Sequence, residues 1–342
     1  IKKYKPFYFL INNFEIYEKV KNKFSKNKIK IINKLNIKNI KKISDITIIA
    51  IPGIVGLSPT IEMTKKSKKI LIANKESIIC GWNLIKHFSI KYKTKIVPVD
   101  SEHFSISKLL ENVKLDNVEK VYLTASGGPF LNLKLNKFKK IKPYHALKHP
   151  KWKMGKKISV DSSTLMNKIL ELIEAQKLFN IPSNKLDIVI HPNSLVHAII
   201  TLKNGLSKFI YHETSMVIPL ANAIFDNKVN INDFYKKKVE PFNSNLNFSK
   251  VDKKKFPIIN LKHKANLYPS TSIIINATNE ILVDQFIKGK IPYLAISKVI
   301  MSILRDRNYK KNAIKRASNL NQIIKTDLWA RKLTFKKIQK YV

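Results

Sequence analysis

Three runs of sequence between residues 124 and 175 decide the fold: TASGGPF at 124–130, HPKWKMGKK at 149–157 and ISVDSSTLMNKILELIEA at 158–175. The first is a turn of small residues, and the second is a basic loop that carries one tryptophan. The third has the spacing of a capped amphipathic helix, because its apolar side chains return every three or four residues. The candidate functional site is predicted around this helix.

The predicted helix has one polar side. At about 100° per residue, Asn167, Lys168, Glu171 and Glu174 share an arc of roughly 120°. Leucine, isoleucine and methionine fill the other side. A surface helix with a solvated polar face is the commoner explanation of such a pattern. A serine-glycine turn upstream, His149 and an isolated pair of acids favour a functional site instead.

Length and composition indicate a water-soluble protein with a large core. The chain has 342 residues, of which 44% are hydrophobic, and this length predicts two or three domains. No apolar run approaches the ~18 residues that a membrane span requires, so no membrane association is expected. Cys80 is the only cysteine, which makes an intrachain disulfide impossible and predicts a reducing compartment, the cytoplasm.

The net charge of +42 raises the possibility of a nucleic-acid partner, since basic surfaces bind phosphate backbones. However, only four of the 65 basic residues are arginine, which is the side chain that nucleic-acid recognition favours. Lysine, isoleucine and asparagine are all abundant, as expected from A/T-rich codons. No zinc-finger spacing or helix-turn-helix signature accompanies the charge. No nucleic-acid partner is therefore expected.

Strands alternate with helices through the first hundred residues. The predicted strands lie at 6–11, 28–32, 46–51, 71–73 and 95–99, and the predicted helices at 14–23 and 76–93. This alternation predicts a parallel, doubly wound sheet. Ligands bind such sheets beyond the carboxyl ends of the strands, which is where Asn74, Lys75 and Glu76 fall.

Two acids follow the last of these strands. Asp100 and Glu102 would lie on the same side of an extended segment, because side chains alternate along a strand. They would alternatively cap a helix that begins near Ser105, although a second carboxylate beyond the cap has no capping role. Such oxygen ligands are suited to Mg²⁺ or Mn²⁺, with Glu171 as a third ligand. His103 is interpreted as structural.

The second half of the chain predicts a mixed sheet and a group of helices. The predicted strands are 118–123, 186–190, 196–202 and 207–212, with a tight turn at Asn204 and Gly205. The predicted helices are 216–225, 272–287, 293–304 and 322–341. Residues 226–260 lack periodicity and are interpreted as a linker. An α+β catalytic region followed by a C-terminal helical bundle is expected.

Six motifs, in order along the chain, together resemble bacterial 1-deoxy-D-xylulose 5-phosphate reductoisomerases, with a looser likeness to alphaproteobacterial members. They are LIANKES (71–77), VDSEH (99–103), TASGGPF (124–130), HPKWKMGKKISVDSSTLMNK (149–168), HPNSLVH (191–197) and INATNE (275–280). The resemblance implies an enzyme of the non-mevalonate isoprenoid pathway in the bacterial cytoplasm. It would rearrange 1-deoxy-D-xylulose 5-phosphate, a small phosphosugar, and reduce the product with NADPH and Mn²⁺ or Mg²⁺. It also implies a homodimer.

The resemblance further implies a domain order and a role for each matching residue. The expected order is the C-terminal part of an NADPH-binding domain at 1–93, a metal and substrate domain at 94–225, the linker at 226–260 and a helical domain at 261–342. The implied metal ligands are Asp100, Glu102 and Glu171. The implied contacts to substrate oxygens near the metal are Lys75 and Ser101. The implied phosphate contacts are Ser126, Ser162, Asn167 and Lys168, with His149 beside them. The implied NADPH contacts are Asn74, Glu76 and Gly155. Trp152 and Met154 match a flap at residues 148–157, and Met216 and Pro219 a facing wall.

The sequence departs from the family at two places. Ile169 replaces the usual glycine of the NKGLE run, so local crowding is expected beside Glu171. No glycine-rich GxGxxG-like turn occurs, and the expected fold is a partial Rossmann-like sheet with its first strand–helix unit missing. The alternative hypothesis is therefore a truncated remnant that binds the phosphosugar without reducing it. Ser162 is expected to bind phosphate near a helix start, where the helix dipole favours an anion.

Overall fold

The computed structural model describes residues 1–342 except 27–28, 35–42, 153, 236–244 and 342. It divides into two compact units, Ile1–Ser44 and Asp45–Val342. The smaller unit is a βαβ arrangement, as predicted: β1 (Tyr8–Leu10) pairs in parallel with β2 (Lys30–Ile32) around helix α1 (Phe14–Lys23). The side chain of Asn13 caps α1 by accepting the Ile16 N–H at 2.9 Å. Residues 28 and 29 were predicted as part of β2; of these, residue 28 lies outside the described residues.

The larger unit begins with the predicted parallel strands. Their order in the sheet is β3-β4-β5, and β4 pairs in parallel with β5. The strands are β3 (Ser44–Ile49), β4 (Ser67–Ile72) and β5 (Lys95–Pro98), and the helices between them are α2 (Leu57–Thr64) and α3 (Lys75–Tyr92). The side chains of Ile70, Leu71 and Ile72 in β4 are buried, and α2 packs against this strand. The carboxyl end of β4 leads directly into Asn74, which caps α3.

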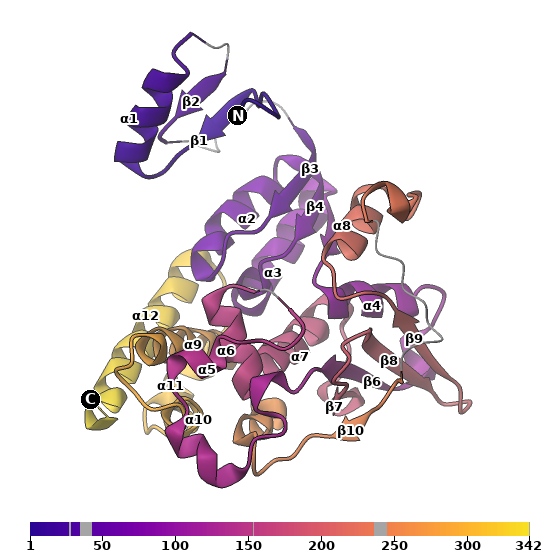
Figure 1. Ribbon diagram of the computed structural model, residues 1–342, viewed down its shortest axis with the longest axis vertical. Helices are drawn as coiled ribbons and strands as arrows, with labels where there is room; N and C mark the ends of the chain where they lie inside the picture. The colour runs from indigo at the N-terminus through magenta and orange to yellow at the C-terminus, as the bar shows by residue number, and fades with distance from the viewer. Residues whose placement is uncertain (27–28, 35–42, 153, 236–244, 342) are drawn as a thin grey trace. The chain divides into compact units, whose positions relative to one another are not determined.

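A second sheet follows, with strand order β10-β7-β6-β8-β9 (Figure 1). β6 pairs in parallel with β7 and antiparallel with β8, so the sheet is mixed, as the α+β prediction requires. The strands are β6 (Val118–Ala125), β7 (Leu186–Ile190), β8 (Val196–Leu202), β9 (Ser207–Tyr211) and β10 (Ser249–Lys250). Helix α4 (Ser101–Leu109) packs against β8 and β9, and α7 (Met166–Phe179) against β6 and β7. The predicted linker thus contributes one edge strand, β10.

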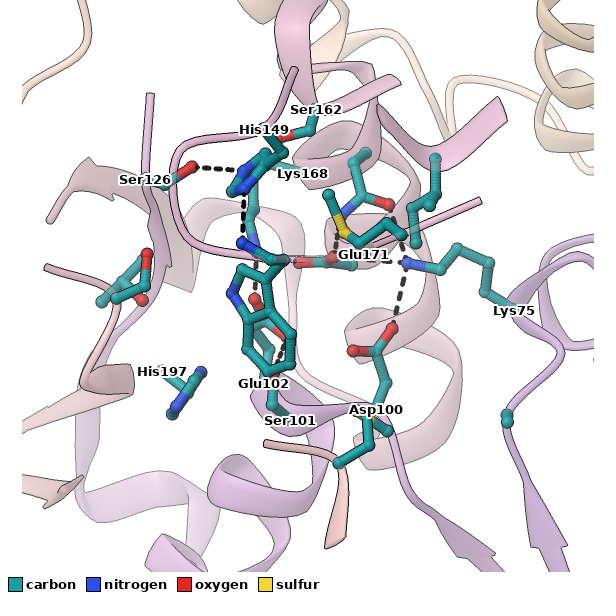
Figure 2. A pocket seen from close by; sticks show the side chains of 18 of the residues that line it. Lys75, Asp100, Ser101, Glu102, Ser126, His149, Ser162, Lys168, Glu171 and His197 are labelled. Atoms are coloured by element: carbon teal, nitrogen blue, oxygen red, sulfur yellow. Dashed lines mark hydrogen bonds and ion pairs between the residues drawn. The ribbon is translucent and has the colours of Figure 1, made fainter. Parts of the chain in front are cut away.

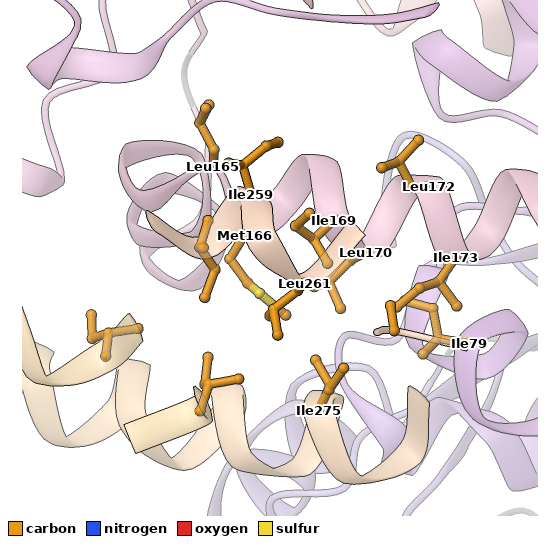
Figure 3. Packing of buried hydrophobic residues seen from close by; sticks show 14 of the residues in the cluster. Ile79, Leu165, Met166, Ile169, Leu170, Leu172, Ile173, Ile259, Leu261 and Ile275 are labelled. Atoms are coloured by element: carbon orange, nitrogen blue, oxygen red, sulfur yellow. The ribbon is translucent and has the colours of Figure 1, made fainter. Parts of the chain in front are cut away.

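The organising helix is two helices rather than one. α6 (Lys156–Thr164) ends where Leu165 adopts a left-handed backbone with φ 63°, and α7 begins at the next residue. The bend lets the buried side chains of Leu165 and Met166 enter the core beside Ile259 and Leu261 (Figure 3). Sequence periodicity cannot detect such a bend, because apolar residues continue through it. Ile169, which replaces the usual glycine, is fully buried in the same cluster.

The surface-helix interpretation of α7 is wrong. Glu171 and Glu174 are each 1% exposed and Lys168 is 7% exposed, so the charged residues on the polar side of the helix are buried, and Asn167 is half-buried. Charged groups are rarely buried to this extent unless they are paired. The polar side of α7 must therefore face other charged groups.

The C-terminal part is helical, as predicted, and packs on α3, α6 and α7. Its helices are α9 (Thr271–Ile287), α10 (Ala295–Ile303), α11 (Tyr309–Ala313) and α12 (Leu320–Ile338), and the 3₁₀ segment Pro257–His263 precedes them. Two further helices lie earlier in the chain, α5 (Pro143–Ala146) and α8 (Val217–Ile224). α9 is central to this group, since both α10 and α12 contact it. Every helix among the described residues is too short or too polar to cross a lipid bilayer.

Candidate active site

One cavity of ≈ 320 Å³ opens between the carboxyl end of β4, the start of α4, the end of α6 and the polar side of α7. Residues predicted for the site form most of its lining: Lys75, Asp100, Ser101, Glu102, Ser126, His149, Trp152, Met154, Gly155, Ser162, Asn167, Lys168, Glu171 and Met216. Residues as far apart in the sequence as Lys75 and Met216 thus meet in one place. The cavity is shown from close by in Figure 2.

Three carboxylates converge on one side of this cavity. Asp100, Glu102 and Glu171 each offer an oxygen atom, and these atoms all lie within 4.8 Å of one another. The prediction that the first two share a face of an extended segment is wrong, because α4 already begins at Ser101 and Glu102 lies in its first turn. The capping alternative is correct in position only: Asp100 is the N-cap residue of α4, but the helix begins at Ser101 and the Asp100 side chain makes no capping hydrogen bond. Oxygen ligands in this arrangement suit a divalent cation such as Mg²⁺ or Mn²⁺.

Two buried lysines neutralise the carboxylates (Figure 2). The Lys75 ammonium lies 3.0 Å from Asp100 Oδ2 and 3.3 Å from Glu171 Oε1, and it donates to Asn167 Oδ1 at 2.8 Å. The Lys168 ammonium lies 2.7 Å from Glu171 Oε2 and also pairs with Glu102. Glu171 is therefore the carboxylate that both lysines share.

The pKa values in this cluster reflect burial first and the neighbouring charges second. Burial, reinforced by the negative charge of Glu102, raises the pKa of Glu171 to about 7. Burial also acts to raise the pKa of Glu102, but Lys168 outweighs it and holds that pKa below its ordinary value. For Lys75 and Lys168 the nearby carboxylates outweigh burial and raise both pKa values. The two lysines are charged at neutral pH, while Glu171 exchanges its proton in the physiological range.

A histidine and an acid lie directly behind the carboxylates. His103 Nε2 donates to the carbonyl oxygen of Glu171 at 3.0 Å, and its Nδ1 lies 3.4 Å from Glu174 Oε2. Asp100, His103 and Glu174 form a second group whose ligand atoms lie within 4.8 Å of one another. Both His103 and Glu174 are almost completely buried, in keeping with the structural interpretation of His103.

Neutral polar side chains line the far side of the cavity. The backbone N–H of Trp152 donates to His149 Nδ1 at 2.9 Å, so Nε2 carries the ring proton and donates to Ser126 Oγ at 3.0 Å. Burial and then the charge of Lys168 lower the pKa of His149 to about 4, so the ring is neutral at pH 7. Ser162 joins this group, but from the last turn of α6 rather than from a helix start. The expected helix-dipole contribution to phosphate binding by Ser162 is therefore wrong.

The serine-glycine turn is held tightly against the end of α6. Gly128 has φ +63°, and a Cβ atom on it would lie 2.9 Å from the Ser162 carbonyl oxygen. Its N–H donates to Ser126 Oγ at 3.1 Å. A side chain at this position would push Ser126 and Ser162 apart, so the glycine is required for the two hydroxyl groups to face the same cavity.

Trp152 packs over the cavity against histidines that the sequence analysis did not assign. Its ring lies 6.2 Å from that of His197, edge to face, and His197 stacks on His212 at 4.0 Å. His197 and Ser194 line the cavity and belong to the HPNSLVH motif, which was the available signal for them. Met154 and Met216 also line it, whereas Pro219 is buried within α8 and is not among the lining residues.

The three predicted cofactor contacts differ in position. Gly155 lines the cavity, as do Ala73 and Ile158, and no atom lies within 4 Å of the point where its Cβ would be. Asn74 and Glu76 are buried beside the cavity and bond to each other at 3.0 Å. Ala73, Gly155 and Ile158 are thus small or apolar lining residues, and Ala73 follows the carboxyl end of β4, where doubly wound sheets bind dinucleotides.

Comparison with known protein families gives three matches along the chain. Residues 1–81 match the 1-deoxy-D-xylulose 5-phosphate reductoisomerase family, residues 96–179 match the C-terminal domain of that family, and residues 213–333 match the DXP reductoisomerase C-terminal domain. Among curated relatives, the reductoisomerase of Pelagibacter ubique is 47% identical over 278 residues, which is 79% of this chain and 70% of the relative. That of Clostridium novyi is 38% identical over 307 residues, 88% of this chain and 79% of the relative.

Solved structures agree over nearly the whole chain. DOX-P reductoisomerase in complex with NADPH, fosmidomycin and magnesium matches with a TM-score of 0.85 and 28% identity, covering 99% of this chain and 87% of that one. The Zymomonas mobilis 1-deoxy-D-xylulose 5-phosphate reductoisomerase in complex with NADPH matches with a TM-score of 0.86 and 27% identity, covering 97% of this chain and 86% of that one.

Proposed function

This chain belongs to the 1-deoxy-D-xylulose 5-phosphate reductoisomerase family, and from that we propose that it converts 1-deoxy-D-xylulose 5-phosphate to 2-C-methyl-D-erythritol 4-phosphate with NADPH and a divalent metal. The observation that carries the proposal is the meeting of three carboxylates, two ammonium groups and a neutral serine–histidine group in one cavity. A phosphorylated sugar with adjacent oxygens needs both kinds of group, one at each end.

We assign the metal to Asp100, Glu102 and Glu171, because they provide three hard oxygen ligands within reach of one ion. A divalent cation bound there supplies Lewis acidity toward the vicinal oxygens of the substrate. Lys75 lies beside these carboxylates and donates to Asn167, so its ammonium can also donate to a substrate oxygen. Ser101 donates to Glu102 at 2.6 Å and fixes the direction of that carboxylate.

We assign the phosphate to Ser126 and Ser162, with His149 next to them, and to Asn167 and Lys168, which lie between these serines and the carboxylates. Hydroxyl, amide and ammonium groups donate hydrogen bonds to phosphate oxygens, and Lys168 adds a positive charge. A phosphate group bound away from the reacting carbons orients the substrate and supplies binding energy. The neutral imidazole of His149 can donate from Nε2 when Ser126 turns toward the ligand.

We assign the nicotinamide of NADPH to a wall of Ala73, Gly155 and Ile158, since these lining residues are small or apolar and Ala73 follows the carboxyl end of β4. Asn74 and Glu76 support that wall from behind. Trp152, Met154 and Met216 line the cavity, and we expect the first two to cover the bound substrate and exclude water from the reacting atoms. We also expect a homodimer in the bacterial cytoplasm, as the family resemblance implies.

The experiment is a binding measurement followed by an assay on the same preparation. First, calorimetry measures fosmidomycin binding in the presence of Mn²⁺, with Asp100→Asn as the control. Second, NADPH oxidation is followed with 1-deoxy-D-xylulose 5-phosphate, and the product is identified by mass. We expect metal-dependent binding and turnover, both lost in the Asp100 variant. Binding without turnover would support the phosphosugar-binding remnant. The absence of both binding and turnover would contradict the proposal.

A further inference from the structure

Lys157 lies at the C-terminal end of the flap and connects it to the parallel-sheet region. It is in the first turn of α6, two residues after Gly155. Its ammonium lies 3.1 Å from Glu76 Oε1 at the start of α3 and 2.9 Å from Asp161 Oδ2, one turn along α6. The side chains of both acids are almost fully buried, at 8% and 2% exposure, whereas that of Lys157 is 29% exposed. One ammonium thus neutralises two buried carboxylates from different helices.

The other oxygen of each carboxylate also has a partner. Glu76 Oε2 accepts from Asn74 Nδ2 at 3.0 Å, and that same amide donates to the carbonyl groups of the turn after β3. Asp161 Oδ1 accepts from Asn279 Nδ2 on α9 at 2.7 Å. Asn279 belongs to the INATNE motif, for which the proposed function has no role. The network therefore joins α3, α6, α9 and one loop through a single central lysine.

The network lies between two segments that line the cavity, the start of α6 and the start of α3. Gly155 and Ile158 lie on either side of Lys157 in sequence and line the cavity, and Lys75 precedes Glu76 and lines it as well. None of the network's own charged groups, Lys157, Glu76 or Asp161, is a lining residue. The ion pairs thus hold the flap end against the helix that carries Lys75 without meeting the substrate.

Removal of the ammonium would leave two buried carboxylates facing each other. Breaking a buried pair by removing one partner is costly, because the remaining charge is neither solvated nor paired. The start of α6 would move away from α3 to admit water, and Gly155 and Ile158 would move with it. The cluster of Asp100, Glu102 and Glu171 is connected to other elements and would remain.

We propose that Lys157 is a positioning residue that holds the flap end, and with it the Gly155–Ile158 wall, at a fixed place relative to Lys75 on α3. The proposal rests on the proposed function in one respect, since it takes this wall as the nicotinamide subsite. It predicts that Lys157 affects NADPH binding and flap order but not metal binding.

The test compares Lys157→Met with Lys156→Met, because Lys156 is the adjacent lysine and is exposed. For Lys157→Met we expect NADPH affinity to fall by about tenfold to a hundredfold, as for loss of a charge-assisted contact. KM for NADPH should rise by a larger factor than kcat falls. The Mn²⁺ affinity of Lys157→Met should stay within about twofold of that of the unmodified chain. Lys157→Arg should restore NADPH affinity, and Lys156→Met should resemble the unmodified chain.

Two further measurements keep the outcome decisive. Hydrogen exchange of a peptide covering residues 154–164 should be faster in Lys157→Met and unchanged in Lys156→Met, with no ligand present. If Lys157→Met does not fold, Lys157→Met/Asp161→Asn removes one of the two buried negative charges, at a residue with no assigned contact to NADPH, and should fold while still losing NADPH affinity. Equal exchange and equal NADPH affinity in the two lysine variants would overturn the proposal, as would a parallel loss of NADPH and Mn²⁺ binding. If the unmodified chain shows no NADPH binding, the proposed function fails, and the exchange measurement still decides whether Lys157 orders the flap end.

Discussion

The two ends of the cavity are built in opposite ways. At the carboxylate end, every charged group is paired with another and all but the partly exposed Asp100 are buried: Lys75 and Lys168 together contact Asp100, Glu102 and Glu171. At the other end, Ser126, His149 and Ser162 are neutral and partly exposed to the cavity. One end is a closed set of ion pairs, and the other is a set of hydrogen-bond donors that faces the solvent.

This difference indicates how each end responds to a ligand. A divalent cation that enters between the carboxylates must replace the two ammonium groups as their partner, so metal binding is an exchange of charges. Lys168, once replaced, is available to a phosphate oxygen. An anion at the serine–histidine end meets neutral donors and breaks no ion pair. We therefore expect metal and phosphate binding to be coupled through Lys168, with little coupling through the serines.

The largest expected effect is at the carboxylate end. Glu171→Gln should reduce metal affinity by at least about 100-fold, because changes one shell further out already cost ten- to a hundredfold. Turnover should be abolished, as measured by NADPH oxidation, while circular dichroism remains unchanged. Glu174→Gln is the matched control, since it is one turn along the same helix and equally buried. An equal loss of metal affinity in that control would place the ion in the Asp100, His103 and Glu174 group instead.

The next effect concerns the lysine between the two ends. Lys168→Met should weaken fosmidomycin binding in the presence of Mn²⁺ by about tenfold to a hundredfold, the cost of one charge-assisted contact. The dephosphorylated substrate analogue should bind the variant and the unmodified chain equally. Calorimetry with both compounds makes the comparison. Equal losses for the two compounds would mean that Lys168 serves only the structure of the carboxylate end.

The pH dependence of metal binding is the third prediction. The raised pKa of Glu171, about 7, means that a proton competes with the cation below neutral pH. Metal affinity should therefore rise by about tenfold between pH 6 and pH 8, because the ionised fraction rises by that factor. Without metal the sign for stability is opposite: a raised carboxyl pKa stabilises the fold at low pH, and this contribution is lost as pH rises through about 7. Burial also raises the pKa of Glu174 to about 7, so Glu174 contributes to the stability trend as well. Glu171→Gln should therefore remove the trend in metal affinity and only weaken the trend in stability, and a persistent trend in metal affinity would exclude Glu171 as the titrating group.

The smallest expected effect is optical. With Trp82 and Trp329 replaced by phenylalanine, the emission of Trp152 should shift when fosmidomycin and Mn²⁺ bind, because we expect the indole to move over the ligand. Mn²⁺ alone should leave the emission nearly unchanged, since the carboxylate end lies behind the flap. An identical spectrum with and without fosmidomycin would contradict a covering role for Trp152.

The sequence by itself determined the order of elements, the motifs and the residue types of the site. Periodicity located the parallel strands and the C-terminal helices, because burial on one face or on both leaves a local pattern. Asp100 and Glu102 were recognisable because they are isolated acids in an acid-poor chain, and the polar side of α7 was recognisable from its helical spacing. The family resemblance then indicated which of these residues belong together.

Only the tertiary structure decided how these groups share their charges. The break at Leu165, the early start of α4 and the two-lysine contact to Glu171 all depend on packing between segments distant in sequence. A pKa near 7 for Glu171 depends on burial, which a helical wheel cannot provide, since the same polar stripe fits a solvated surface. Lys156 and Lys157 are indistinguishable in sequence, yet the fold exposes one and places the other between Glu76 and Asp161. Local patterns report what each segment can bury, and the assembled fold alone determines which charges meet.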